Sequence, residues 1–216
     1  MSASQSAVAA ALLARHGRTY ARDAGIRLQD TPQPLYQLLV LSSLLSARIR
    51  ASVAVAAARA LFHDGMRSPR AMAEASWQRR VDALGEGHYR RYDERTATQL
   101  GEGAERLLEA HGGDLRRVRR DADGDEGALR SGLRETPGMG PAGVDIFLRE
   151  AQAVWPELAP RFDAKALQGA ERLGLPREPD RLARLAGDAG PAVLAAALVR
   201  AALEKDVVDD VLEHAG

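Results

Sequence analysis

Apolar residues recur at helical spacing through most of the chain. The segment 35–45 is apolar on nearly every face, which is typical of a buried helix. No segment alternates apolar and polar residues over several positions, as a half-buried strand would. The pattern therefore predicts an all-α fold. The predicted helices cover residues 5–24, 35–45, 51–62, 77–84, 89–110, 141–153, 164–173, 180–185, 192–203 and 206–213.

Serine, aspartate, glycine and proline mark the ends of these segments. Ser68 and Pro69 predict a helix start, because serine is a preferred N-cap and proline is tolerated in the first turn. The acidic turn at residues 121–126 superficially resembles a calcium-binding loop. Glu126 stands where such a loop needs glycine, and Gly132 where it needs glutamate. We expect this turn to cap the helix that follows.

The most informative break lies around Pro137. A helical pattern runs into Arg134, and a second pattern begins at Pro141, whose missing N–H costs nothing at a helix start. Gly138 and Gly140 allow positive φ and the close approach of a ligand to the main chain. The first amides of a helix have no intrahelical acceptor, and the helix dipole favours an anion beside them. We therefore expect two helices joined by a tight hairpin that offers N–H groups to a phosphate.

Composition excludes several kinds of chemistry. The 30 basic and 30 acidic residues give a formal net charge of zero, so DNA contact would need a local basic face. The absence of cysteine excludes disulfides, thiolate catalysis, zinc fingers and a four-cysteine iron–sulfur cluster. The five histidines show no metal-ligand spacing. No apolar run approaches the roughly 20 residues that span a bilayer. We expect no signal peptide, because residues 1–13 lack a basic start and a long apolar core. We expect a cytoplasmic protein that associates with the nucleoid when bound to DNA.

Three segments together resemble a known family. The hairpin region reads Thr136-Pro137-Gly138-Met139-Gly140-Pro141-Ala142-Gly143-Val144, a second segment Phe162-Asp163-Ala164-Lys165, and a third Leu44-Leu45-Ser46-Ala47-Arg48. They resemble the Leu-Pro-Gly-Val-Gly-Arg-Lys-Thr-Ala hairpin, the Val-Asp-Thr-His segment and the Leu-Leu-Ser-Ala-Gln segment of the endonuclease III-like helix–hairpin–helix DNA glycosylases. The resemblance covers roughly residues 35–175.

The resemblance implies a catalytic role for Asp163. A carboxylate there would stabilise the positive charge that builds on the sugar, or orient an attacking water. Aspartate directly before a helix is also a preferred N-cap, and the two roles can coexist. Bifunctional members of the family carry their Schiff-base lysine where this chain has Ala142, so no lyase activity is expected. Lys165 would stay charged beside Asp163, which favours a phosphate-binding or surface role.

Further DNA contacts are implied by position. Arg48 stands where the family's glutamine fills the gap left by a flipped base, although capping a helix C-terminus is an equal alternative. Ser46 of the same segment would line the base pocket. Arg91 is the counterpart of the family's wedge residue, with a solvated helix start as the alternative. Ser42 and Ser43 stand where adenine-removing relatives carry a second acid, which argues against that branch.

The resemblance also implies two helical lobes with a cleft between them. Residues 35–135 would form one lobe; residues 1–34 plus 136–216, with the hairpin at 136–141, would form the other. The expected activity is monofunctional removal of a damaged base from double-stranded DNA by hydrolysis of the N-glycosidic bond. The expected site residues are catalytic Asp163 and the DNA-contacting Gly138, Met139, Gly140, Ala142, Arg48, Arg91, Ser46 and Lys165.

Two alternatives to hydrolysis remain open. One is a relative that binds damaged or bent DNA but cuts no bond, which the missing lysine, the missing cluster and the zero net charge favour. The other is a helical protein–protein module whose hairpin only packs; it predicts no salt-dependent DNA affinity. We expect a monomer without a metal, cofactor or membrane contact, although the hairpin leaves room for a monovalent cation.

Overall fold

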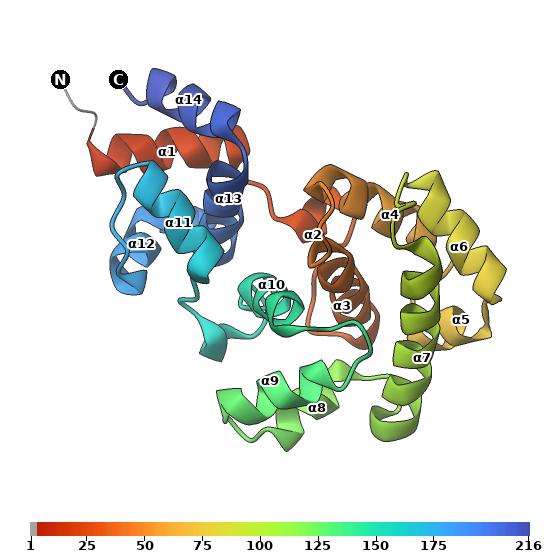
Figure 1. The fold of residues 1–216 in the computed structure, drawn as a ribbon. Helices are drawn as coiled ribbons and strands as arrows, with labels where there is room; N and C mark the ends of the chain where they lie inside the picture. Colours follow the sequence, from red (N-terminus) through yellow and green to blue (C-terminus); the bar gives the residue numbers. More distant parts are fainter. Residues whose placement is uncertain (1–3) are drawn as a thin grey trace. The chain divides into compact units, whose positions relative to one another are not determined.

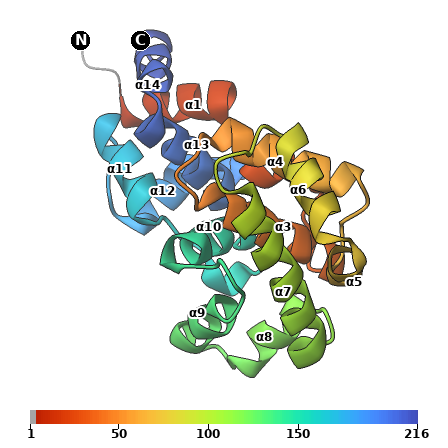
Figure 2. The ribbon, with the colours of Figure 1, turned by 45° about the vertical axis from the view of Figure 1, so that its right-hand side comes forward.

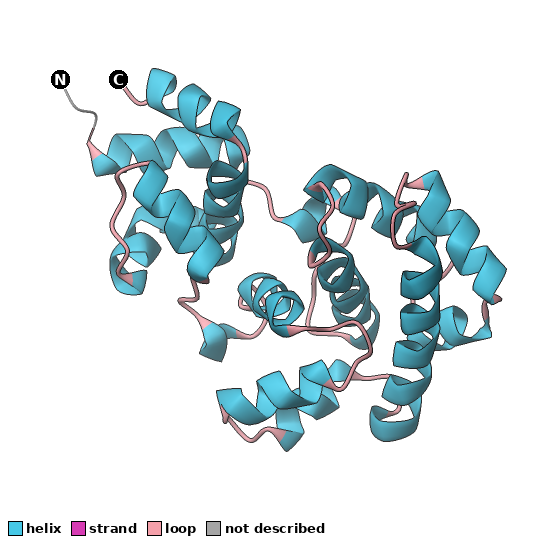
Figure 3. Ribbon diagram, in the orientation of Figure 1, coloured by secondary structure: helices cyan, strands magenta, loops and turns pink. Residues whose placement is uncertain are grey.

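The computed structural model describes residues 4–216, and every regular element in that range is helical (Figure 3). The predicted all-α fold is therefore confirmed. No single helix in residues 4–216 is long and apolar enough to cross a membrane; the pair Pro179–Ala189 and Pro191–Leu203, bent by 107°, passes that test only together. The elements are α1 (Gln5–His16), α2 (Tyr20–Asp23), α3 (Pro32–Leu45), α4 (Ala51–His63), α5 (Pro69–Glu74), α6 (Trp77–Glu86), α7 (Asp93–His111), α8 (Leu115–Asp121), α9 (Glu126–Arg134), α10 (Pro141–Ala151), η1 (Pro156–Leu158), α11 (Ala164–Arg172), α12 (Pro179–Ala186), η2 (Gly187–Ala189), α13 (Pro191–Leu203) and α14 (Lys205–His214).

The chain divides into two compact units. The larger unit comprises Ala21–Phe147, and the smaller unit combines the chain up to Tyr20 with Leu148–Gly216. These boundaries differ from those expected at residues 34/35 and 135/136, because the hairpin contacts α3 and α7 and so belongs with the larger unit. Residues 1–3 of the expected second lobe lie outside the described residues. The cleft expected between the lobes stays a prediction.

Helix α3 forms the core of the larger unit. Leu35, Leu38, Leu41 and Leu44 are fully buried, as expected of a helix that is apolar on all sides. Helix α4 packs against α3, and α6 packs against α4. Helix α7 in turn contacts α5 and α6, and these helices lie side by side in Figures 1 and 2. The long helix α7 thereby gains a rigid support along one side.

Helix α13 holds the smaller unit together. It packs against α1, α11, α12 and α14, and its closest approach is to α11. At that crossing a Cβ on Gly169 would lie only 1.8 Å from the carbonyl oxygen of Leu198. The helices α1 and α14 are joined by Arg15, whose Nε donates to Asp210 at 2.6 Å. This hydrogen bond lowers the pKa of Asp210 to about 2, assisted by a second contact from His16.

Local capping signals predicted several helix starts correctly. The Ser68 hydroxyl accepts a hydrogen bond from Ala71 N at 3.2 Å at the start of α5. The acidic turn caps α9, because Asp125 accepts from Ala128 N at 2.9 Å. Both contacts satisfy amides that a helix leaves unpaired in its first turn.

Several helix boundaries differ from the predicted ones, and one helix was not predicted. The predicted helix 5–24 is interrupted after His16, where the amide of Gly17 closes the last turn of α1 by donating to Leu13 O. The predicted helix 89–110 starts only at Asp93, after a loop in which His88 has a φ of 63°. The basic run at residues 116–120 forms part of α8, which was not predicted.

Replacing Gly169 with alanine should destabilise the smaller unit. A methyl group at this site would overlap the backbone of α13, and overpacking of this kind costs roughly 1–3 kcal/mol of unfolding free energy. Urea denaturation followed by circular dichroism measures the loss. The matched control is Gly85→Ala in α6, where no atom lies within 4 Å of the added Cβ. That variant should be neutral or gain up to about 1 kcal/mol; equal costs at both sites would contradict the tight crossing.

Candidate nucleic-acid interface

The connection between α9 and α10 contains a type II β-turn. Met139 N donates to Thr136 O at 3.0 Å, with Pro137 and Gly138 as the two central residues. The φ of Gly138 is 83°, and a type II turn requires a positive φ at its third residue. Proline presets the φ of the second residue and glycine tolerates that of the third. The predicted break at Pro137-Gly138 is thus a single defined turn.

Several amides near this turn have no acceptor in the protein. Among the described residues, no acceptor faces the main-chain N–H of Gly138, Ala142 or Gly143, whereas Met139 N and Gly140 N bond to Thr136 O and Gly138 O. Gly138 and Ala142 are exposed, and the Met139 side chain is buried. Of the two glycines expected to grip a phosphate, only Gly138 keeps a free amide.

The first turn of α10 rests on the C-terminal end of α3. A Cβ on Gly143 would lie 2.5 Å from Met139 Sδ and 3.6 Å from Ser46 Cβ, so glycine permits this close packing. Ser46 Oγ donates to Ser43 O at 2.7 Å and is therefore tied to its own helix. Arg48 follows two residues later and is exposed. The structure thus brings two of the segments that resemble the glycosylases, the hairpin and the Ser46 segment, into contact.

Arg91 lies in an exposed loop before α7, and its guanidinium carbon is 5.2 Å from the centre of the Tyr92 ring. The hairpin contacts α7 at Gln99 and Gly103. Because a helix rises about 1.5 Å per residue, the start of α7 and Gln99 are about 9 Å apart along the helix axis. The structure therefore places Arg91 away from the turn, and its role as a wedge stays a prediction.

Asp163 lies in the smaller unit and has two partners there. Its Oδ1 accepts from Ala166 N at 2.9 Å, which is the N-cap contact of α11. Its Oδ2 accepts from Arg149 Nη1 at 2.5 Å. The side chains of Asp163 and Arg149 are only 7% and 3% exposed. Both carboxylate oxygens are therefore engaged, and the negative charge is balanced by a buried guanidinium.

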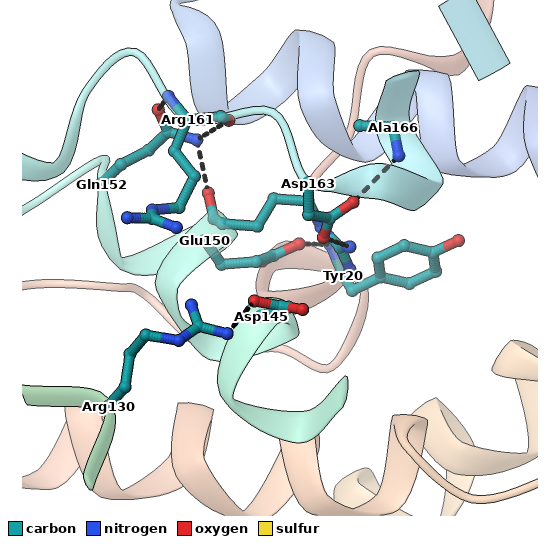
Figure 4. A network of polar contacts seen from close by, with 9 residues as sticks. Tyr20, Arg130, Asp145, Glu150, Gln152, Arg161, Asp163 and Ala166 are labelled. Carbon is teal, nitrogen blue, oxygen red and sulfur yellow. Dashed lines mark hydrogen bonds and ion pairs between the residues drawn. The ribbon is translucent and has the colours of Figure 1, made fainter. Parts of the chain in front are cut away.

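Gln152 ties the segment before Asp163 to the end of α10 (Figure 4). Its Nε2 donates to the carbonyl oxygens of Arg149 and Arg161, each at 2.8 Å. Its Oε1 accepts from Arg161 N at 2.9 Å. Beside it, the carboxylate of Glu150 accepts from Tyr20 N at 2.8 Å. Burial of these groups would be costly without such partners, so the network fixes the position of Asp163.

The sequence did not identify Arg149 as the buried partner of Asp163. The only signal was the place of Arg149 in a segment of mainly apolar residues, where a charged residue needs a buried partner. Lys165, by contrast, is exposed, and its Nζ donates to Gln168 Oε1 at 2.8 Å. The phosphate-binding role expected of Lys165 stays a prediction.

A small cavity lies behind the hairpin in the larger unit. Its volume is about 10 Å³, and Tyr36, Ser43, Gln99 and Thr136 are among the residues that line it. This is the lower limit for holding one water molecule, so it has no space for a base. Burial raises the pKa of Tyr36. Residues 4–216 contain no group of three or more His, Cys, Asp or Glu side chains placed to hold a metal ion.

Comparison with protein-family models, with curated proteins and with solved structures found no match to this chain. The resemblance to the endonuclease III-like glycosylases therefore rests on the three quoted segments alone. Function has to be argued from the geometry of those segments.

Replacing Asp163 with asparagine tests its structural role. Asparagine is an equally good N-cap, so the main loss is the charge that pairs with Arg149. Leaving a buried charge without its partner costs about 3–5 kcal/mol of unfolding free energy. The control is the double variant Asp163→Asn/Arg149→Met, which removes both charges and should regain much of this loss. A single-variant cost below about 1 kcal/mol in urea denaturation would refute the pairing.

Proposed function

We propose that this protein binds double-stranded DNA through phosphate contacts at the α9–α10 hairpin, without cutting a bond. The observation that carries the proposal is that the main-chain N–H groups of the exposed residues Gly138 and Ala142 have no acceptor among the described residues. They lie at and just before the first turn of α10, where the helix dipole favours an anion. The exposed side of the turn has no bulky side chain, because residues 138, 140 and 142 are glycine or alanine.

Three exposed arginines near the hairpin supply a local positive charge, although the formal net charge of the whole chain is zero. Arg134 ends α9 directly before the turn, Arg106 donates to Glu135 O at 3.2 Å, and Arg48 follows the Ser46 segment. Counterion release scales with the number of phosphates neutralised, at a slope of about −0.9 per phosphate in log K against log salt. With these three arginines we expect a slope of roughly −2 to −3, which is shallow for a DNA-binding protein.

Binding is better supported than hydrolysis because of the partners of Asp163. A carboxylate that stabilises a developing sugar cation has to present unbalanced negative charge to the substrate. Here Arg149 cancels that charge, and the N-cap contact occupies the other oxygen. Hydrolysis would require Asp163 to exchange a buried ion pair for the substrate. DNA binding at the hairpin requires no such rearrangement.

Charge substitutions at Ala142 test the phosphate contact. Ala142 is exposed beside the free amides, and an acidic residue in a first helical turn favours the helix itself. Ala142→Asp should therefore fold normally but weaken duplex affinity at least tenfold by repelling phosphate. Ala142→Lys should strengthen binding and steepen the salt slope by about 1. Fluorescence anisotropy at several salt concentrations measures both; equal affinities for the two variants would refute the proposal.

A substrate panel separates binding from base removal. We expect the wild-type protein to release no base and to leave the strands intact across duplexes that carry oxidised, alkylated, deaminated or mismatched bases. The assay is run at concentrations that saturate the anisotropy signal, so that a negative result refers to bound DNA. Release of a base that disappears in Asp163→Asn, while that variant keeps the wild-type duplex affinity, would instead establish the hydrolytic activity.

A further inference from the structure

Three residues on one face of α7 contact the hairpin and the end of α9. Gln99, Gly103 and Arg106 are spaced by four and three positions, so they lie on the same side of the helix. They contact Gly138, Thr136 and Glu135 respectively, so α7 runs antiparallel to the connection. Neither the glycosylase resemblance nor the capping signals pointed to these residues of α7.

Gln99 approaches Gly138, the third residue of the turn. A Cβ on Gly138 would lie 2.8 Å from Gln99 Oε1 and 3.4 Å from Ser43 Oγ. Gln99 of α7 and Ser43 of α3 thus both lie on the side of Gly138 where a Cβ would project. Gly138 itself is exposed, and its amide has no acceptor among the described residues.

The other two contacts hold the approach to the turn. A Cβ on Gly103 would lie 3.0 Å from Thr136 Cγ2, so the backbone of α7 passes directly behind Thr136. Arg106 Nη1 donates to Glu135 O at 3.2 Å, at the C-terminal end of α9. Glycine is a poor helix former, and its presence inside α7 is accounted for by this close approach.

We infer that Gln99 is a positioning residue of the DNA-binding hairpin: its side chain fills the space behind Gly138 and holds the turn in the conformation that presents the Gly138 amide. The inference rests on the proposed function. A preformed turn avoids the entropy cost of ordering a loop when the ligand binds. Gln99 acts through Gly138 and makes no contact with DNA itself.

Three variants of exposed or half-buried glutamines test this role. Gln99→Ala removes the support and should weaken duplex binding about tenfold, with an unchanged salt slope because no phosphate contact is lost. Gln99→Met is similar in length but lacks hydrogen-bonding groups, and it should restore most of the affinity. The control Gln78→Ala makes the same truncation at an exposed site on α6 and should change nothing.

Each outcome of this series decides the inference. Wild-type affinity in Gln99→Ala would overturn it, because the turn would then hold its shape without support. Affinity that stays low in Gln99→Met would also overturn it, because the carboxamide would then contact DNA directly. Affinity lost in Gln99→Ala and regained in Gln99→Met supports it.

A reversible crosslink gives an independent test. The chain has no cysteine, so Gly103→Cys/Thr136→Cys can form only one disulfide. The close approach of these two positions suits the roughly 3.5–4.5 Å between Cβ atoms that a disulfide needs. The oxidised protein should bind duplex DNA at least as tightly as the reduced protein. Loss of binding on oxidation, regained on reduction, would show that the hairpin has to leave α7 and would overturn the inference.

Failure of the inference can be told apart from failure of the proposed function. The function fails if the wild-type protein shows no salt-dependent affinity for duplex DNA. The positioning role of Gln99 can then still be tested in the free protein, through the amide signal of Gly138 in ¹H–¹⁵N spectra. That signal should broaden or shift in Gln99→Ala and return towards its wild-type position in Gln99→Met; an unchanged signal in Gln99→Ala overturns the positioning role.

Discussion

The contact of the Thr136–Met139 turn with α3 and α7 is the constraint on which the candidate interface depends. Proline at the second residue of this type II turn has no N–H, so the Gly138 amide is the one central amide of the turn, and it has no acceptor among the described residues. Here two helices close the inner side: Gln99 and Ser43 lie next to Gly138, and Gly103 allows α7 to approach Thr136. Glycine at residues 103, 138 and 143 therefore allows close packing, and at residue 138 it also allows the positive φ of the turn. An added side chain at residue 138 or 143 would push the turn away from its support.

The ion pair between Arg149 and Asp163 determines the charge that Asp163 presents in the smaller unit. Asp163 stands where the resemblance implies a catalytic carboxylate, and its N-cap contact is compatible with that role. The guanidinium of Arg149 neutralises the charge of Asp163 in this structure, and the proposal of binding without hydrolysis rests on that pairing. The same aspartate in the same local pattern can thus serve stability alone. The difference lies in one residue 14 positions upstream.

Local signals predicted much of the fold and part of the interface. Capping by Ser68 and Asp125, the buried character of α3 and the break at Pro137 follow from interactions within a few residues, which sequence patterns report directly. The helix boundaries at Gly17 and Tyr92 were missed because apolar residues continue at helical spacing past both positions. The unit boundaries were missed because they depend on which distant helices the hairpin contacts.

The sequence by itself determined that the chain is helical, that a turn separates two helices at Pro137-Gly138, and that cysteine-based chemistry is excluded. These properties depend on residue type and on neighbours along the chain. Only the tertiary structure decided which amides stay free, that α7 supports the turn, and that Asp163 is paired with Arg149. Each of these depends on a contact between elements separated by 10 or more residues, and neither helical periodicity nor a short motif encodes such a contact.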